Sequence, residues 1–535
     1  MRRGLLIAAA LGILAVITWA RVRRIDSLPD QGYFAKYTIV ADQILAGHMP
    51  RERLLDFSPL YLWVVVAMRA IGAGFHTIRT LQIALLSVAA VLVAIAARRF
   101  GSIAVLAAPI LLLGSRGALV CATEVEPETL ILVLNAGALA ALDFNHLLAG
   151  FLLGLSAVCR PVALLVMVAL AIWFRSWRIV AGALIPIVVI LIVNFSLTGE
   201  VTLMDPGTVF YEGMNPSATG YEGVQPRIVD DLERQSRDPD YLHVAYRVVA
   251  AQALGHRVTR AESNRYWTGK ALAFARTYPI AAARLIAKKS YFGLHSYEAY
   301  DLATMARKDA MLSRDLFIPF GIVVAFAIVA MVLRVPGIAP FVIFACCIGV
   351  TLVLFYVTAR QRNAMLPAIV ILAAAGIAMW GRLLVGPRRL RAGATLVFAV
   401  LVAVLLNING PAQREDAAGW LGIRNGFDDA LTLEQQGRWA EADGLLARLE
   451  ASGYRPIREN RAVPSIAFYR ALAAAHLGRD PWPLLAQAEA EAPGNEHMLA
   501  ALAVRGDRRA GQLLFELHDR FTARRSLLTA RQQGM

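Results

Sequence analysis

Long apolar runs recur along the first four hundred residues, and they limit what this chain can fold into. They lie near residues 4–20, 80–97, 102–115, 129–142, 147–159, 160–175, 177–195, 315–333, 336–357, 364–381 and 393–409. Many approach the ~20 residues that a helix needs to cross a bilayer. In addition, 58% of all residues are hydrophobic, which is high for a soluble protein. We therefore expect an all-α, polytopic membrane protein with about 11 spans.

The arginines between these runs indicate how the chain is oriented. With the N-terminus inside, the inward connections hold Arg2, Arg3, Arg98, Arg99, Arg175, Arg178, Arg334, Arg382, Arg388, Arg389 and Arg391. This distribution follows the positive-inside rule. Residues 60–74 are also apolar, but counting them as a span would turn the connection with Arg98 and Arg99 outward. We therefore leave this stretch out of the spans and expect three outward loops, at 21–79, 115–128 and 196–314.

Charge and cysteine content argue against several other classes of protein. The formal net charge is +15, but arginines that orient spans account for it, so no nucleic-acid partner is expected. The four cysteines lack metal-ligand spacing with histidine, so neither a metal nor another cofactor is expected.

The stretch 4–19 resembles a signal peptide. Arginines at 21–24 replace the cleavage site, so we expect an uncleaved anchor. Their outward position indicates either a weakly oriented first span or a nearby lipid phosphate.

The first outward loop carries polar residues at helical spacing. Asp30, Tyr33 and Tyr37 would share one face of a helix that Pro29 can open. On these residues alone, Asp30 is a first-turn acid and the tyrosines are interfacial anchors. A carboxylate site held beside the membrane is the alternative.

Acids and turn residues gather in the other two loops. Glu126 lies between Glu124 and Glu128, from which the sequence cannot separate it, and is either a helix-capping acid or a site carboxylate. In the third loop, Tyr211 and Asn215 lie in a glycine-containing segment. Asn215 can offer both a donor and an acceptor to sugar hydroxyls, while a turn-rich surface loop is the alternative.

Cations mark the rest of the outward face. Lys289 and Glu298 come later in the third loop, where a lysine is often a membrane anchor. Arg360 and Arg362 open the span at Pro367 on the side that the charge rule disfavours, which calls for an anionic partner. Two positions apart on a helix, these arginines would point about 200° apart, so only one would face a given cavity.

These elements resemble, in the same order, the GT-C class of membrane glycosyltransferases. This class uses polyprenyl-phosphate sugars and includes aminoarabinose and protein O-mannosyl transferases. Residues 30–33 (Asp-Gln-Gly-Tyr) and 58–61 (Ser-Pro-Leu-Tyr) resemble the start and end of its first outward loop. Residues 210–220 resemble its Asn-Phe-Tyr-x-Gly-Asn-Asn-Pro loop, and residues 358–367 resemble its Arg-x-Arg-x-x-x-Pro element.

The resemblance implies an enzyme that moves a sugar from a polyprenyl-phosphate donor to a lipid, glycan or protein acceptor. It implies a multi-pass protein of a bacterial inner membrane, with the active site at the periplasmic face, and a juxtamembrane helix over residues 60–74. It implies inversion of the sugar with Asp30 as general base. Arg360, Arg362 and Lys289 would bind the donor phosphate, and the sugar or acceptor would contact Tyr33, Glu126, Tyr211, Asn215 and Glu298. Gln31 and Ser58 depart from the class pattern, so the sugar and the acceptor stay open.

Two other classes of protein are weighed against this one. A transporter or lipid-sugar flippase would place acids and bases within spans or use paired interrupted helices, whereas these spans are nearly free of charge. A membrane scaffold with a partner-binding helical domain would leave Asp30 and the outward arginines without a role.

From residue 411 the composition changes. Residues 411–535 contain sixteen Arg, no Lys and sixteen Asp plus Glu, so they are charge-balanced. Residues 429–449 and 464–478 have the periodicity of paired helices, with a turn beginning at Gly437, as in tetratricopeptide repeats. We expect a glycosyltransferase-like membrane domain over 1–410 and a soluble α-helical, tetratricopeptide-like domain over 411–535, on the periplasmic side. A generic helical cap and a partner-binding module are both open for this domain.

Overall fold

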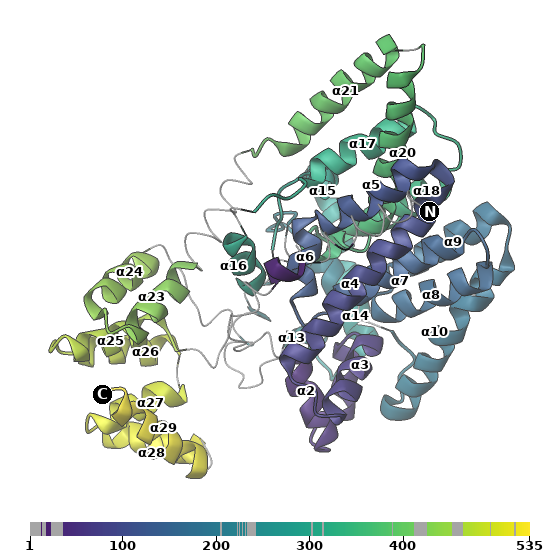
Figure 1. The fold of residues 1–535 in the computed structure, drawn as a ribbon. Helices are drawn as coiled ribbons and strands as arrows, with labels where there is room; N and C mark the ends of the chain where they lie inside the picture. The colour runs from purple at the N-terminus through teal and green to yellow at the C-terminus, as the bar shows by residue number, and fades with distance from the viewer. Residues whose placement is uncertain are drawn as a thin grey trace. The chain divides into compact units, whose positions relative to one another are not determined.

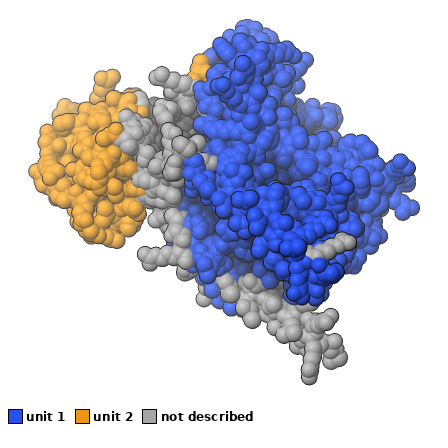
Figure 2. All heavy atoms as spheres, turned by 90° about the horizontal axis from the view of Figure 1, so that it is seen from above, with its two compact units in different colours: residues 1–225, 246–410 blue, residues 226–245, 411–535 orange. Residues whose placement is uncertain are grey.

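The computed structural model describes a helical protein in two compact units. The described residues are 36–203, 206–221, 242–300, 303–312, 315–387, 389–410, 425–451, 464–492, 494–517 and 520–535, with a few isolated residues outside these ranges. Every regular element in them is a helix, so the expected all-α class is confirmed (Figure 1). The first unit comprises residues 1–225 and 246–410, and the second comprises residues 226–245 and 411–535 (Figure 2). The sequence analysis assigned residues 226–245 to the first domain.

The helices of the first unit follow the apolar runs and the outward loops. They are α2 (Lys36–Leu45), η2 (Arg51–Asp56), α3 (Pro59–Ala70), α4 (Phe75–Ala97), η3 (Arg98–Phe100), α5 (Ser102–Leu113), α6 (Arg116–Ala122), α7 (Glu128–Ala141), α8 (His146–Cys159), α9 (Ala163–Phe174), α10 (Trp177–Thr198), α11 (Pro206–Gly213), α13 (Leu242–Leu254, which starts in the second unit), α14 (Arg260–Thr277), α15 (Pro279–Leu294), α16 (Ala303–Met311), α17 (Phe320–Val332), α18 (Ala339–Leu354), α19 (Ala359–Arg362), α20 (Leu366–Val385) and α21 (Arg389–Asn407).

Several of these helices are candidate membrane spans. Among the described residues, four are long and apolar enough to cross a bilayer: Phe75–Phe100, α10, α20 and α21. Helices α5 and α6, bent by 58° at their junction, make a fifth if the pair is one span. Helices α3, α7, α8, α9, α17 and α18 are apolar but shorter. Helices that can cross a membrane are therefore present, and the expected number of about 11 spans stays a prediction.

The arginine-rich turns meet at one end of the first unit. Arg382 Nη2 donates to Phe100 O (2.9 Å), and Arg99 Nη1 donates to Gly337 O (3.4 Å). Arg99 also forms an ion pair with Asp143. These contacts join the α4–α5, α7–α8 and α17–α18 turns to the last turn of α20. We call this the arginine end.

The polar loops meet at the other ends of the same helices. Ser58 Oγ donates to Cys159 O at the end of α8 (2.9 Å), and Gln82 Nε2 donates to Ala122 O at the end of α6 (3.2 Å). The segment before α17 also lies at this end, because Ile318 N donates to Gly114 O just after α5 (2.9 Å). We call this the carboxylate end. The helices named here run between the two ends, and their orientation in a membrane stays a prediction.

Glycines set the closest helix packing in this unit. A Cβ added at Gly150 or Gly154 of α8 would lie 2.0 Å from Ile179 O or 2.3 Å from Ala183 O of α10. A Cβ at Gly182 of α10 would lie 2.1 Å from Leu147 O. The two backbones therefore approach each other through small residues four apart, as in membrane helix pairs.

The second unit is built from short helices. They are α23 (Asn425–Gln435), α24 (Trp439–Ala451), α25 (Ile466–His476), α26 (Trp482–Glu491), α27 (Glu496–Val504), α28 (Arg508–Leu517) and α29 (Arg520–Gln532). The α23–α24, α25–α26 and α27–α28 connections each contain a glycine with positive φ: Gly437 (74°), Gly478 (69°) and Gly506 (104°). Glycine adopts this conformation without strain. The turn expected at Gly437 is present, and membership of the tetratricopeptide class stays a prediction.

Candidate functional site

The connector between α18 and α20, residues 355–365, passes several polar clusters of the carboxylate end. Val357 N donates to Gly220 O (3.2 Å), and Ala359 N donates to Ala299 O (2.7 Å). The connector is therefore fixed to two parts of the third loop. It contains the four-residue helix α19, which carries both arginines singled out in the sequence.

Arg360 lies against two carboxylates of the second loop. Its Nη1 is 3.6 Å from Glu126 Oε2 and 3.8 Å from Glu128 Oε1. Lys36 Nζ lies 3.4 Å from Glu126 Oε1, and Arg160 Nη2 donates to Glu128 Oε1. Three cations from α2, the end of α8 and α19 thus surround two carboxylates. We call these five residues the carboxylate cluster.

The cluster presents its cations toward solvent. The side chains of Lys36, Arg160 and Arg360 are 21%, 20% and 14% exposed, whereas those of Glu126 and Glu128 are 9% and 2% exposed. An anion approaching the cluster therefore meets guanidinium and ammonium groups before it meets a carboxylate. Arginine suits such a role because its planar fork can bind a phosphate through two hydrogen bonds.

Burial dominates the electrostatics of Glu126. Loss of solvent raises the pKa of its carboxyl, and the charges of Lys36 and Arg360 oppose that rise. A carboxylate in such surroundings retains its charge only while its cations stay in place. The charge of Glu126 is therefore sensitive to any ligand that draws Arg360 or Lys36 away.

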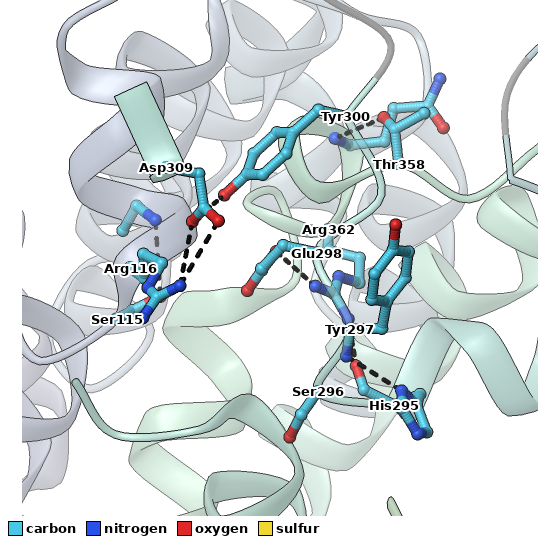
Figure 3. Close-up of polar contacts among 12 residues, drawn as sticks. Ser115, Arg116, His295, Ser296, Tyr297, Glu298, Tyr300, Asp309, Thr358 and Arg362 are labelled. Carbon is cyan, nitrogen blue, oxygen red and sulfur yellow. Dashed lines mark hydrogen bonds and ion pairs between the residues drawn. The ribbon is translucent and has the colours of Figure 1, made fainter. Parts of the chain in front are cut away.

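Arg362 has different partners. Its Nη1 donates to His295 O and its Nη2 to Glu298 Oε2 (Figure 3). Its guanidinium lies over the Phe320 ring, 4.7 Å from the centroid. The residue is buried, at 4% exposure. Arg362 thus holds the loop after α15 against α17. The structure brings Glu298 to Arg362 and not to Glu126.

Helix α6 makes room for this pair. A Cβ at Gly117 would lie 3.0 Å from Glu298 Oε2. The neighbouring Arg116 donates to Asp309 Oδ2 (3.3 Å), and Asp309 also accepts a hydrogen bond from Tyr300 OH (2.9 Å; Figure 3). Burial raises the pKa of Asp309, and Arg116 opposes this. The second loop is therefore the element around which the third loop packs.

Two further contacts fix the backbone that leads to Glu126. The buried Lys308 Nζ bonds to Glu124 Oε1 and to Thr123 O, each at 2.8 Å. Gln82 donates to the carbonyls of Ala122 and Glu124. Removing one member of such a buried ion pair costs about 3–5 kcal/mol. The segment before Glu126 is thus held from α16 and from α4.

Lys289 lies on α15 and contacts the first residue of the same connector. Its side chain is fully buried, and its Nζ donates to Phe355 O at 2.5 Å. No carboxylate of the described residues forms an ion pair with it. Burial lowers the pKa of Lys289 to about 8. An ammonium with one carbonyl partner still has donors for a second ligand, because it carries three N–H groups.

Tyr211 lies in the last turn of α11, and Asn215 lies just after this helix. The Tyr211 ring packs on Trp267, with centroids 4.9 Å apart. Asn215 Nδ2 donates to Tyr211 O (2.9 Å) and to Glu212 O (3.1 Å), so its amide closes the end of the helix. These contacts of Tyr211 and Asn215 all lie within the third loop.

The sequence singled out some cluster members and missed another. Asp30 and Tyr33 lie outside the described residues. Glu126 and Arg360 meet, and Glu128, which the sequence could not separate from Glu126, belongs to the same cluster. Lys36 was missed. Its only sequence signal is its position beside Tyr37 on the first-loop helix, and lysines in loops are too common for that to be specific.

The comparisons supply no relative. No family model, no curated protein and no solved structure matches this chain. Within the part of the chain that the structure describes, no group of three or more His, Cys, Asp and Glu side chains is placed to hold a metal ion.

Proposed function

We propose that this protein is a GT-C-type membrane glycosyltransferase that uses a polyprenyl-phosphate sugar as donor. The observation that carries the proposal is the carboxylate cluster, in which Arg360, Arg160 and Lys36 stand on the solvent side of two buried carboxylates. Cations that are fixed before the substrate arrives are suited to hold a phosphate leaving group. The order of motifs from Asp30 to Arg362 in the sequence supports the same class.

The chemistry would be a single displacement. A hydroxyl oxygen of the acceptor attacks the anomeric carbon, whose bond to the phosphate oxygen breaks with inversion. The electron pair of that bond stays on the polyprenyl phosphate, where Arg360 and its neighbouring cations stabilise the charge. The acceptor proton passes to a carboxylate, for which Asp30 is our candidate. Glu126 would then orient the acceptor or keep Arg360 and Lys36 in place.

Arg362 takes a supporting part in this proposal. Because it is buried between His295, Glu298 and Phe320, it positions the connector that carries Arg360. Lys289 would contact the phosphate or the lipid nearest to it.

The membrane arrangement is part of the same proposal. The protein would have about 11 spans, with the carboxylate end on the periplasmic side of a bacterial inner membrane. The positive-inside distribution of the arginine end supports this orientation. The second unit would be a tetratricopeptide-like domain on the same side, because an odd number of spans separates it from the N-terminus.

Binding of a polyprenyl-phosphate analogue to the purified protein in detergent tests the proposal. Arg360→Ala and Arg360→Lys should each weaken binding about tenfold or more, because lysine cannot copy the bidentate fork. Arg265→Ala, an exposed arginine on α14, is the matched control and should bind as the wild type does. Asp30→Asn should retain binding while losing transfer by ~10²–10⁴-fold.

Arg362 separates a binding role from a supporting one. Arg362→Lys should lower the melting temperature along with binding, whereas Arg360→Lys should lower binding alone. Wild-type affinity in folded Arg360→Ala protein would remove the carboxylate cluster as the phosphate site.

A further inference from the structure

One face of α15 is apolar and exposed. Exposure is 69% for Ile280, 40% for Ile286 and 37% for Leu294, and the intervening positions on this face are Ala283, Ala287 and Ser290. At 100° per residue these six positions fall within about 120° of one another. The opposite face is buried and contains Ala282, Leu285, Lys289 and Phe292. The helix therefore has an inner face that packs on the protein and an outer face made of uncharged residues.

The charges of α15 all have one sign and flank the exposed face. Arg284 and Lys288 lie next to it on the helix circumference, and the sequence of α15 contains no acidic residue. Lys288 Nζ lies 5.3 Å from the centroid of the Phe292 ring. Tyr278, just before the helix, is 57% exposed. An apolar face with a cationic flank and an aromatic end is the pattern of helices that lie in a membrane interface.

Helix α15 contacts the ends of two apolar helices, of which α21 is a candidate membrane span and α18 is shorter. Tyr291 OH of α15 donates to Leu405 O in the last turn of α21 (3.1 Å), and Lys289 bonds to the residue that follows α18. Both helix ends expose apolar side chains themselves, at Leu405 (62%) and Leu354 (44%). Exposed apolar side chains of α21 and α18 therefore lie beside the places where these helices meet α15.

We propose that α15 lies in the bilayer interface and binds anionic lipid there. Ile280, Ile286 and Leu294 enter the boundary of the acyl chains, and Arg284 and Lys288 contact anionic headgroups. The occupant of this face is the bilayer, because the apolar face is flanked by positive charge only and α15 contacts the end of the candidate span α21. This proposal does not depend on the glycosyltransferase assignment, since it concerns the outer face of α15 alone.

Spin labels on the full chain in nanodiscs test the proposal. Cys121 and Cys159 are buried, so replacing Cys346 and Cys347 by Ala gives a suitable background. A nitroxide at Ile286→Cys should collide more often with oxygen than with a water-soluble nickel chelate. A label at Arg265→Cys, on the exposed surface of α14, is the control and should show the reverse preference.

Each other result would overturn the proposal. A label at Ile286→Cys that prefers the nickel chelate would place α15 in water. A label protected from both reagents would mean that protein covers the face, either a second copy or the second unit.

A separate experiment tests how the positive charges of Arg284 and Lys288 contribute to membrane binding. Adding phosphatidylglycerol to phosphatidylcholine nanodiscs should deepen the Ile286→Cys label in the otherwise unchanged chain. It should have no such effect when Arg284→Gln and Lys288→Gln are also present. Equal depth in the two lipid compositions would refute the binding of anionic lipid.

Discussion

The fold changes the proton affinity of the buried Lys289. Its pKa is lowered to about 8 by burial, from 10.5. Between these values the folded protein binds fewer protons than the unfolded chain, so the free energy of unfolding should rise with pH. Lys289→Met, which cannot titrate, should lack this rise. Unfolding in denaturant at pH 8 and pH 10 measures the difference.

The same residue gives a functional prediction. If Lys289 contacts the donor phosphate, affinity for a polyprenyl-phosphate analogue should fall as the pH rises through about 8, because the neutral amine no longer attracts the anion. The Lys289→Met protein should bind more weakly and should lack this pH dependence. An identical pH profile in both proteins would assign Lys289 a structural role only.

At the residue scale, the sequence could predict which residue types matter but not their partners. The sequence predicted that Arg360 and Arg362 would point about 200° apart on a helix, and in the structure they have different partners. Which of the two meets the second loop depends on contacts from α6 and from the loop after α15, far away in sequence. The same applies to Lys36, whose contact with Glu126 joins the first and second loops.

At the element scale, the close packing of α8 against α10 is open to a direct test. Gly154→Ala would place a Cβ 2.3 Å from Ala183 O, so the two backbones must separate. Separation forfeits the van der Waals contact that holds membrane helices together, and we expect a loss of about 1–3 kcal/mol. Thermal unfolding in detergent should therefore occur at a lower temperature.

A second glycine supplies the matched control for this substitution. Gly349 lies in the apolar helix α18, and a Cβ there meets nothing within 4 Å. Gly349→Ala should leave the melting temperature unchanged or raise it slightly, since alanine favours helix. Equal effects of Gly154→Ala and Gly349→Ala would show that α8 and α10 do not pack as described.

Helices that follow long apolar runs were predictable from sequence, and short polar helices were not. The span expected at 177–195 lies within α10, and the span expected at 393–409 lies within α21 except for its last two residues. By contrast, the stretch 115–128 was expected as a loop, and it contains α6, a single buried element of seven residues. Periodicity is weak over so few residues, and α6 is stabilised by tertiary contacts, such as the bond from Arg116 to Asp309.

At the scale of the whole molecule, the two ends of the first unit differ in chemistry. At the arginine end, Arg382 and Arg99 bond to backbone carbonyls of neighbouring turns. At the carboxylate end, buried acids such as Glu124 and Glu126 are paired with cations from other loops. Arginines left on the turns of one end orient spans in a membrane, whereas buried ion pairs contribute little to orientation because their charges cancel. The arrangement thus predicts which end stays in the cytoplasm.

Reporter fusions test that orientation. Alkaline phosphatase fused after Gly101, Asn145 or Pro387 should be inactive, because these positions lie at or next to the arginine end. Fusions after Ala122 or Gly410 should be active, because these positions follow helices that run to the carboxylate end. A reporter that is active only in the cytoplasm, such as β-galactosidase, should give the opposite pattern and so controls for expression.

The fusion after Asn145 is the most informative, because Asp143 pairs with Arg99 and must lie on the same side as Gly101. Activity after Asn145 but not after Gly101 would mean that the chain does not cross the membrane once through α5 and back through α7. Activity after Gly101, Asn145 and Pro387 with inactivity after Ala122 and Gly410 would show that the arginine end faces the periplasm, and the proposed active site would then be assigned to the wrong side of the membrane.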